Sequence, residues 1–185
     1  MKKLTLYPIS SVDELASPHG TSGVSLETPA LEFFTDFSLV QPLVIDASVT
    51  AVQAREMMIR THVRLKFVVD EADRFVGVIS SDDLAERRIV QKVAEGYSRG
   101  DIAVTDLMTP KGELMAMGID EVTRATIGDV VNLLKNYRQQ HCLVVDRQTH
   151  SVRGIFSSSD ISRKLRLPID IQDRSDFFRV FSAVH

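Results

Sequence analysis

Apolar residues recur at helical spacing in two distant stretches of the chain. The later stretch places them at positions i, i+3, i+4 and i+7, which is typical of a helix with one buried face: Ile127, Val130, Val131 and Leu134. The earlier stretch also carries apolar side chains that can share one helical face: Ala51, Ala54, Met57 and Met58. The constant shift that places Ala51 on Ile127 superposes the two stretches. The pattern therefore predicts two related helices.

The same shift superposes two short apolar strands that each end in aspartate. Both read Val-Val-Asp, at residues 68–70 and 144–146. Polar residues follow at 70–73 and 146–150, and each polar stretch is succeeded by a second apolar run. Each copy therefore predicts a helix, a strand, a turn, a strand and a closing helix.

The turn before each closing helix is the most distinctive repeated feature. Residues 76–84 and residues 153–161 both contain a Gly, two apolar residues, Ser-x-x-Asp and another apolar residue. The shift that places Asp83 on Asp160 is longer by one position than that of the helices, because the second hairpin carries one extra residue. A fixed long period indicates that one supersecondary unit is used twice.

The repeat divides the chain into four parts. Residues 1–34 form an arm and a short helix, residues 35–100 and 101–168 form the repeats, and residues 169–185 form a tail. Thr28-Pro29 predicts the start of the short helix. Similar segments, beginning at Thr35 and Thr105, precede the repeats. Three tail aromatics at helical spacing could pack on this chain or on a second copy: Phe177, Phe178 and Phe181.

The composition is typical of a soluble globular protein, with 44% hydrophobic and 25% charged residues. The net charge of −3 argues against a protein that binds nucleic acid through its phosphates. No apolar run is long enough to span a membrane, and the run from Leu4 to Leu6 is too short for a secretory leader. The single Cys142 cannot form an internal disulfide. We therefore expect a cytoplasmic protein that binds neither nucleic acid nor membrane.

Ser80 with Asp83, and Ser157 with Asp160, have two interpretations. A Ser three residues before an acidic residue resembles a capping box, which stabilises the start of a helix by about 1 kcal/mol. The same geometry suits a nucleotide: free amides at a helix start attract phosphate, Ser supplies a hydroxyl, and Asp accepts hydrogen bonds from ribose. Both interpretations explain the repetition, so the choice stays open.

Together these features resemble a tandem pair of CBS domains, also called a Bateman module. The resemblance rests on the order of the elements, the Val-Val-Asp strand ends, the Asp-Leu-Met-Thr segment at 106–109 and the doubled turn, and it covers residues 35–168. It implies an α+β fold in which two repeated β-α-β-β-α units pack by pseudo-two-fold symmetry into one module. It also implies two clefts for adenosine-containing ligands, in which Ser80 and Ser157 face phosphate while Asp83 and Asp160 hold ribose.

Four further residues are assigned to these clefts. Proline often precedes the Val-Val-Asp strand of such domains, beside the adenine, and Phe67 and Leu143 occupy those positions here. Lys66 and His141 stand close by and could contact the phosphates of a nucleotide. Two arginines share this location: Arg64 and Arg138. For any one of these charged residues, a solvated surface position is the alternative.

The leading hypothesis is a non-catalytic regulatory module that senses an adenine nucleotide (AMP, ADP or ATP) or S-adenosylmethionine, with no required cofactor. We expect it to act as a homodimer on an effector protein. The alternative is a structural or interaction protein that binds no nucleotide, its Ser-x-x-Asp motifs serving as helix caps. An enzyme ranks third, because no catalytic constellation can be assembled. The histidines show no metal-ligand spacing, and Cys142 stands in an apolar strand where cysteine usually packs as a small hydrophobe.

Overall fold

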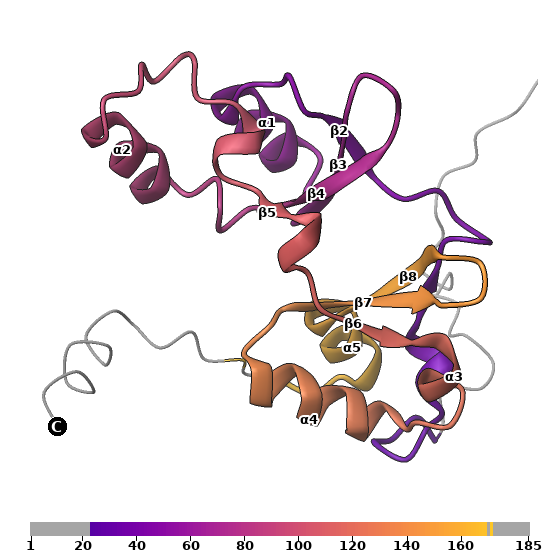
Figure 1. Cartoon of the computed structure of the whole chain (residues 1–185). Coiled ribbons are helices and arrows are strands. Elements are labelled where there is room, and N and C mark those ends of the chain that lie inside the picture. The colour runs from indigo at the N-terminus through magenta and orange to yellow at the C-terminus, as the bar shows by residue number, and fades with distance from the viewer. Residues whose placement is uncertain (1–22, 170, 172–185) are drawn as a thin grey trace, which may run out of the picture.

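The computed structural model describes residues 23–169 and Ile171, and within them two α+β halves face each other (Figure 1). The upper half contains β2 (Val44–Asp46), α1 (Ala51–Arg60), β3 (Leu65–Val69), β4 (Phe75–Ser80), α2 (Glu86–Ala94) and β5 (Thr109–Pro110). The lower half contains β1 (Thr35–Asp36), β6 (Ala116–Gly118), α3 (Ile119–Val122), α4 (Ile127–Tyr137), β7 (His141–Asp146), β8 (Ser151–Ser157) and α5 (Ser158–Leu165). Short 3-10 helices occupy Ala30–Phe33, Val104–Asp106 and Lys111–Glu113.

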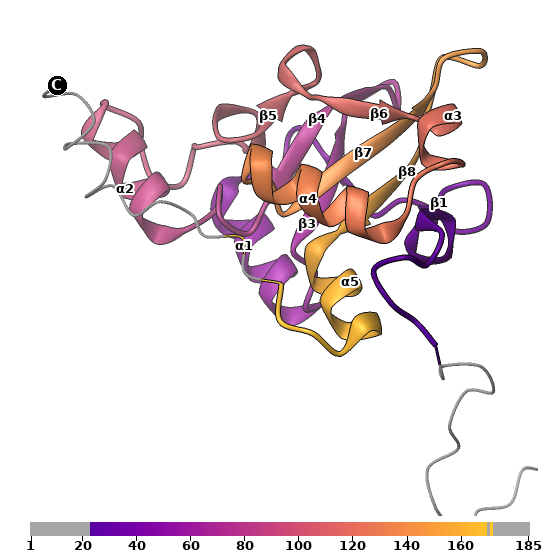
Figure 2. The same ribbon diagram turned by 90° about the horizontal axis from the view of Figure 1, so that it is seen from below.

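These elements confirm the predicted α+β fold with two repeated units. Figure 2 shows α4 and α5 covering the outer face of the lower sheet. None of the helices in the described part of the chain is long and apolar enough to cross a membrane. The predicted aromatic tail at Phe177, Phe178 and Phe181 lies outside the described residues.

The strands form two four-stranded sheets with the orders β2-β3-β4-β5 and β1-β8-β7-β6. In each sheet a long antiparallel hairpin is joined on one side by a parallel strand, β2 beside β3 and β6 beside β7. Both hairpins shift register at the Val-Val step, between Val68 and Val69 and between Val144 and Val145. The shared irregularity shows that the sequence repeat is also a structural repeat.

The remaining edge strand of each sheet comes from the other repeat. β1 pairs antiparallel with β8, and β5 pairs antiparallel with β4. The two exchanges are equivalent, because Thr35 lies opposite Ile155 and Thr109 lies opposite Val78. The counterpart of Thr35 is therefore Thr109, although the similar sequence segment begins at Thr105. Thr105 belongs instead to a 3-10 helix, an irregular turn that a short sequence match does not reveal.

The chain just before β1 packs on the lower half. The Ala30 amide donates to the Ala125 carbonyl (2.9 Å), and the Ile127 amide donates to the Thr28 carbonyl (2.8 Å). Residues 102–104 make the same pair of hydrogen bonds at the start of α1. The segment before β1 is therefore equivalent to residues 102–104 and belongs to the structural repeat.

The predicted helix start at Thr28-Pro29 was wrong in its details. Residues Ala30–Phe33 form a 3-10 helix, with Pro29 as the residue before it and no side-chain cap. The Thr28 hydroxyl oxygen accepts a hydrogen bond from the Ser25 amide instead (2.9 Å). The backbone pairing of this segment with the start of α4 decides its conformation.

Each half has its own apolar core between its sheet and its helices. All four predicted residues of the α4 face are buried, which confirms that prediction: Ile127, Val130, Val131 and Leu134. In α1, Ala51, Ala54 and Met58 are buried, but Met57 is 39% exposed, so the prediction was wrong for Met57. Met57 stands six residues after Ala51, and therefore about 120° away around the helix.

A third apolar cluster fills the seam between the two sheets. Its buried members are two pairs of equivalent residues, Phe67 with Leu143 and Val78 with Ile155. Phe37, which follows β1, packs against Phe67 at right angles with ring centroids 5.2 Å apart. Each sheet therefore buries one face against its helices and the other against its partner sheet.

A glycine lies at the point where each exchanged strand pairs with the hairpin of the other repeat. A Cβ added to Gly77 would lie 2.5 Å from the carbonyl oxygen of Thr109. A Cβ added to Gly154 would collide with the carbonyl oxygen of Thr35 and with the ring of Phe34. The Gly that opens each doubled motif is thus required by the close approach of the other repeat's strand.

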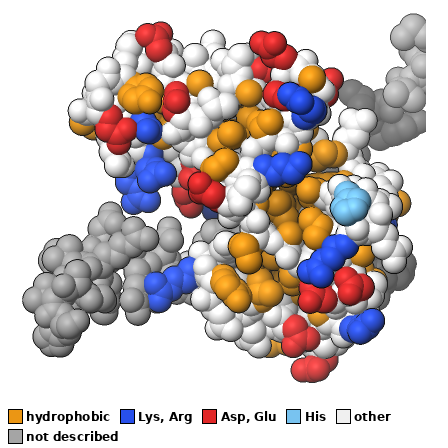
Figure 3. Space-filling view, in the orientation of Figure 1, with side chains coloured by type: hydrophobic (Ala, Val, Ile, Leu, Met, Phe, Trp, Pro, Cys, Tyr) orange, Lys and Arg blue, Asp and Glu red, His pale blue; other side chains and the backbone are white. Residues whose placement is uncertain are grey.

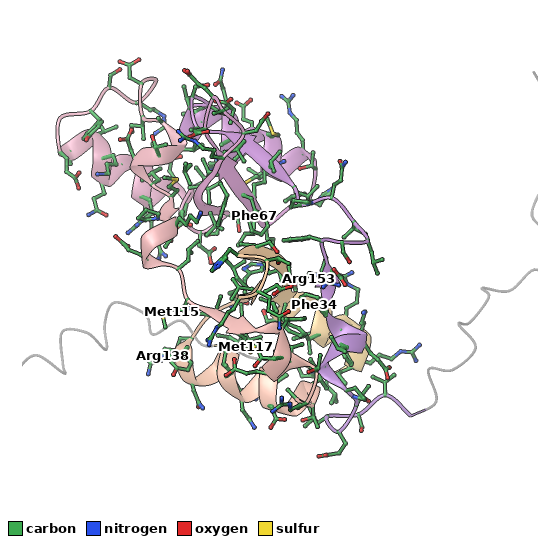
Figure 4. The ribbon with its side chains drawn as sticks, turned by 45° about the vertical axis from the view of Figure 1, so that its right-hand side comes forward. Phe34, Phe67, Met115, Met117, Arg138 and Arg153 are labelled. Carbon is green, nitrogen blue, oxygen red and sulfur yellow. The ribbon has the colours of Figure 1, made fainter. Side chains whose placement is uncertain are left out.

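An ion pair further ties β1 to the lower sheet. The Arg153 guanidinium donates two hydrogen bonds to the Asp36 carboxylate, both 2.8 Å long. These bonds hold the pKa of Asp36 well below its usual range. Figure 4 shows Arg153 beside Phe34 at this crossing. The equivalent positions in the upper half are Val76 and Pro110, so the ion pair is specific to this exchange.

We expect Gly154→Ala to lower the free energy of unfolding by about 2 kcal/mol, because the new methyl group overpacks the contact with β1. Gly100→Ala is the matched control, since its Cβ would meet nothing within 4 Å. We expect the control to change stability by less than about 1 kcal/mol. Urea denaturation measures both, and equal stabilities for the two variants would contradict the steric role of Gly154.

Candidate ligand-binding clefts

Two clefts open beside the apolar cluster between the sheets, at the hairpin ends that carry the Ser-x-x-Asp turns. The first cleft has a volume of about 400 Å³ and contains Ser80 and Asp83. The second cleft has a volume of about 540 Å³ and contains Ser157 and Asp160. The two doubled turns therefore lie in two equivalent cavities, as expected for a repeat whose copies face each other.

Each cleft combines a polar turn of one repeat with an apolar wall from the other. The turn at Ser80 faces Met115 and Leu143 in the first cleft, and the turn at Ser157 faces Leu43 and Phe67 in the second. A ligand in either cleft would therefore contact both repeats.

Leu43 and Met115 are equivalent positions, each just before the strand that pairs in parallel with its hairpin. Leu43 is 53% exposed and Met115 is 70% exposed. Figure 4 shows Met115 near Arg138 on one edge of the lower half, and both residues line the first cleft. Each cleft thus offers an apolar surface to solvent beside its polar turn.

In the first cleft Ser80 and Asp83 bind each other. The amide and the hydroxyl of Ser80 both donate to Oδ2 of Asp83, at 2.9 and 2.6 Å, and the Asp83 amide donates to Oγ of Ser80 at 3.2 Å. This is the reciprocal bonding of a capping box. It closes the turn that precedes α2, which itself begins at Glu86. Oδ1 of Asp83 accepts no hydrogen bond from the described residues.

In the second cleft the same residue types do not form a box. The hydroxyls of Ser157 and Ser159 share a hydrogen bond of 2.8 Å, and Ser157 makes no side-chain cap to α5. Asp160 accepts a hydrogen bond from Arg163 at 2.6 Å, a pair exposed on the surface. The reciprocal bonds of a capping box therefore form in the first copy but not in the second, and in the first copy they close a turn rather than cap α2, whose N-cap is Ala85.

His141 lies in the wall that separates the two clefts and lines both of them. Burial lowers its pKa, and the nearby Asp160 and Asp82 only partly oppose this effect. The imidazole is therefore neutral at pH 7 and can donate one hydrogen bond and accept another. Arg64 also lines both clefts and adds positive charge to the shared wall.

Besides Ser80, Asp83 and Asp160, four of the other five predicted site residues line a cleft and one does not. Ser157, Phe67 and His141 line the second cleft, and Leu143 and His141 line the first. Lys66 lies outside both clefts, and its buried ammonium group donates to the Val44 carbonyl at 3.2 Å. Since side chains alternate along β3, Lys66 points to the face opposite Phe67, toward the helices.

The prediction missed the apolar residues that open each cleft and a basic residue in the second. Leu43 and Met115 are equivalent in the structure, but fewer residues separate them than separate equivalent residues of the helices and hairpin strands. The sequence repeat therefore does not align these two residues. Arg163 stands three residues after Asp160, a spacing that places the two side chains on one helical face. That spacing was the available signal for Arg163.

The described residues contain no group of three or more His, Cys, Asp or Glu side chains arranged to hold a metal ion. Cys142 is buried in the lower core, and burial raises the pKa of its thiol. A protonated, inaccessible thiol is a poor nucleophile.

Several solved structures resemble this chain. An uncharacterized conserved protein from Pyrococcus horikoshii shares 20% identity at a TM-score of 0.56, with 80% of this chain and 98% of that chain covered. CBSX2, solved in complex with AMP, shares 25% identity at a TM-score of 0.51, with coverages of 74% and 93%. A hemolysin-like protein containing a CBS domain, from Oenococcus oeni, shares 15% identity at a TM-score of 0.52, with coverages of 76% and 91%.

No curated protein sequence matches the chain. The CBS domain family, however, matches it at residues 35–89 and again at residues 104–167, which together make up more than half of its length. The two matches coincide with the two structural repeats. The chain therefore belongs to the CBS domain family, as a tandem pair.

Proposed function

We propose that the protein is a non-catalytic regulatory module that binds an adenosine-containing ligand in its two clefts. The observation that carries the proposal is that each cleft joins a Ser-x-x-Asp turn of one repeat to an exposed apolar wall of the other. Volumes of about 400 and 540 Å³ suit a ligand of nucleotide size. The complex of CBSX2 with AMP supports this class of ligand.

The two sides of each cleft suit the two ends of a nucleotide. An adenine ring would lie against Leu43 and Phe67 in the second cleft, or against Met115 and Leu143 in the first. Ribose would reach the Asp of the turn, and phosphate would reach its Ser. AMP, ADP, ATP and S-adenosylmethionine all share this adenosine core, and no other cofactor is required.

The second cleft needs to break fewer internal hydrogen bonds than the first in order to bind a ligand. The Asp160 carboxylate and the Ser157 hydroxyl bind only exposed neighbours, which a ligand can replace at little cost. In the first cleft a ligand would have to share Asp83 with the capping box. The interaction-only alternative, in which the polar groups of the motif serve only the fold of the chain, is therefore favoured only for the first cleft, where they close the turn before α2.

Regulation would act through linkage. A ligand that contacts both repeats stabilises the relative arrangement of the halves that it fits best, and it can shift the population only by its difference in affinity. An effector protein would bind the outer surface of the module and distinguish one arrangement of the halves from another.

Exposed apolar residues on the helices of the upper half offer a surface for that contact. Ile59 on α1 is 58% exposed and Val90 on α2 is 52% exposed. We propose that this surface serves a homodimer or an effector in the cytoplasm.

Ligand binding should raise the thermal stability of the protein. At one hundred times the dissociation constant, AMP or another adenosyl ligand should stabilise the folded state by about 2.7 kcal/mol. Thermal melting with AMP, ADP, ATP and S-adenosylmethionine measures this. If none of them shifts the melting temperature at millimolar concentration, the protein is an interaction module that binds no nucleotide.

Two aspartate variants should separate recognition from capping. We expect Asp160→Ala to weaken AMP binding about tenfold with little change in stability, because its pair with Arg163 is exposed. Asp83→Ala should cost about 1 kcal/mol of stability, because it removes the capping box. Asp101→Ala, on the surface outside both clefts, is the control. Calorimetric titration and urea denaturation measure the two effects, and unchanged affinity in Asp160→Ala would contradict a role in recognition.

Binding of a phosphate-bearing ligand should become tighter as the pH falls from 7.5 to 6. His141 has a lowered pKa in the free protein, and a nearby phosphate would raise it again, so the complex would bind more protons than the free protein. We expect AMP affinity to rise about threefold over this range. His141→Asn should lose this rise in affinity and keep only the pH dependence that comes from protonation of the phosphate itself. Parallel pH profiles for the two proteins would exclude His141 from the phosphate site.

A further inference from the structure

A third cleft opens at the other end of the two hairpins, between their turns. We call it the hairpin cleft; its volume is about 910 Å³, and it lies between the turn residue Asp73 and the turn residue His150. Figure 3 shows hydrophobic side chains gathered where the two halves meet, bordered by basic residues and a histidine. The Ser-x-x-Asp turns lie at the opposite ends of β4 and β8 and do not line this cleft, which meets the second cleft only at Phe37, Pro42 and Phe67.

One wall of the hairpin cleft is aromatic. Phe37, Phe67 and Phe75 all line it. The Phe67 ring is the centre of this wall, with centroid distances of 5.2 Å to Phe37 and 5.6 Å to Phe75. Phe37 and Phe67 also line the second cleft, whereas Phe75 lines only the hairpin cleft. Such a surface suits a flat aromatic group, which can pack edge-on or face-on to several rings.

The opposite wall is smaller, and the pseudo-symmetry explains why the space exists. The counterpart of Phe75 is Val152, since each stands two residues before the glycine of its hairpin. The counterpart of Phe67 is Leu143, and that of Phe37 is Lys111. The first repeat therefore carries aromatic rings at three positions where the second repeat carries aliphatic or charged residues, and the side chains leave an open space at this end of the two sheets.

Two cations border the aromatic wall. The Lys111 ammonium lies over the Phe75 ring, 5.6 Å from its centroid, and Arg147 extends from the second hairpin turn. Neither forms an ion pair within the described part of the chain. Of the two carboxylates in the cleft lining, Asp146 accepts hydrogen bonds from the amides of Gln148 and Thr149, and Asp73 stands in the other turn.

We propose that the hairpin cleft is a separate binding site for a small aromatic acid, an aromatic ring system that carries one anionic group. The ring system packs on the phenylalanine wall, and the anion is held by Lys111 with Arg147. The cleft volume is at the upper end of the range for small-molecule sites, and an apolar pocket with a few convergent polar groups is their usual form. The module would thus respond to two chemically different ligands at opposite ends of its hairpins.

The test uses the full chain and two fluorescent probes of similar shape. 1-Anilinonaphthalene-8-sulfonate carries the anion, and N-phenyl-1-naphthylamine lacks it. We expect saturable binding of both, with Lys111→Gln weakening the sulfonate about fivefold and leaving the neutral probe unchanged. Lys135→Gln, on the exposed surface of α4, should change neither.

A second variant tests the location of the probe. Val152→Phe places in the smaller wall the residue that the other repeat carries, and it should weaken both probes tenfold or more without loss of thermal stability. Val90→Phe, on the exposed face of α2, is its control. Equal binding to the parent chain and to Val152→Phe would overturn the proposal.

Two further outcomes would also overturn it. Displacement of the sulfonate probe by AMP would show that the two ligands share one site. Absence of probe binding to the full chain would show that the cleft does not accept this class of ligand. The second result is independent of whether AMP itself stabilises the protein.

Discussion

The exchange of edge strands between the two repeats is the constraint on which the rest of the structure depends. β1 completes the sheet of the lower half and β5 completes that of the upper half, so neither sheet is whole without a segment of the other repeat. The contact is close enough to exclude a Cβ at Gly77 and Gly154. Backbone pairing at this distance fixes the position of each half relative to the other.

The two Ser-x-x-Asp clefts are a direct consequence of that arrangement. The hairpins pack face to face through Phe67, Val78, Leu143 and Ile155, and the turn at the end of each hairpin faces the apolar wall of the other repeat. The two repeated turns differ, however, in their hydrogen bonds. The Ser80–Asp83 turn closes on itself as a capping box, whereas the Ser157 and Asp160 side chains bind only exposed neighbours. One architecture thus yields one turn whose Ser and Asp bind each other and one turn whose Ser and Asp bind only exposed neighbours.

The sequence predicted what depends on local periodicity and on the repeat. The buried face of α4, both hairpins and the doubled polar turn follow from spacing alone, and the turns do line the clefts. The exchange of β1 and β5 could not be predicted, because such short strands carry no periodic signal and their partner strands are distant in the sequence. Lys66 was assigned to the cleft because it is a positive charge just before the first Val-Val-Asp segment, but strand alternation turns its side chain to the opposite face.

The central claim is that an adenosine-containing ligand binds where the Ser-x-x-Asp turn of one repeat meets the apolar wall of the other. Amide NMR spectra recorded during a titration with AMP test it most directly, since they locate the ligand as well as detect it. The account predicts the largest shift changes at residues 157–160 and at Leu43, with smaller changes at 80–83 and 114–115. Spectra unaltered at millimolar AMP, or changes confined to the hairpin turns at 70–74 and 146–150, would contradict it.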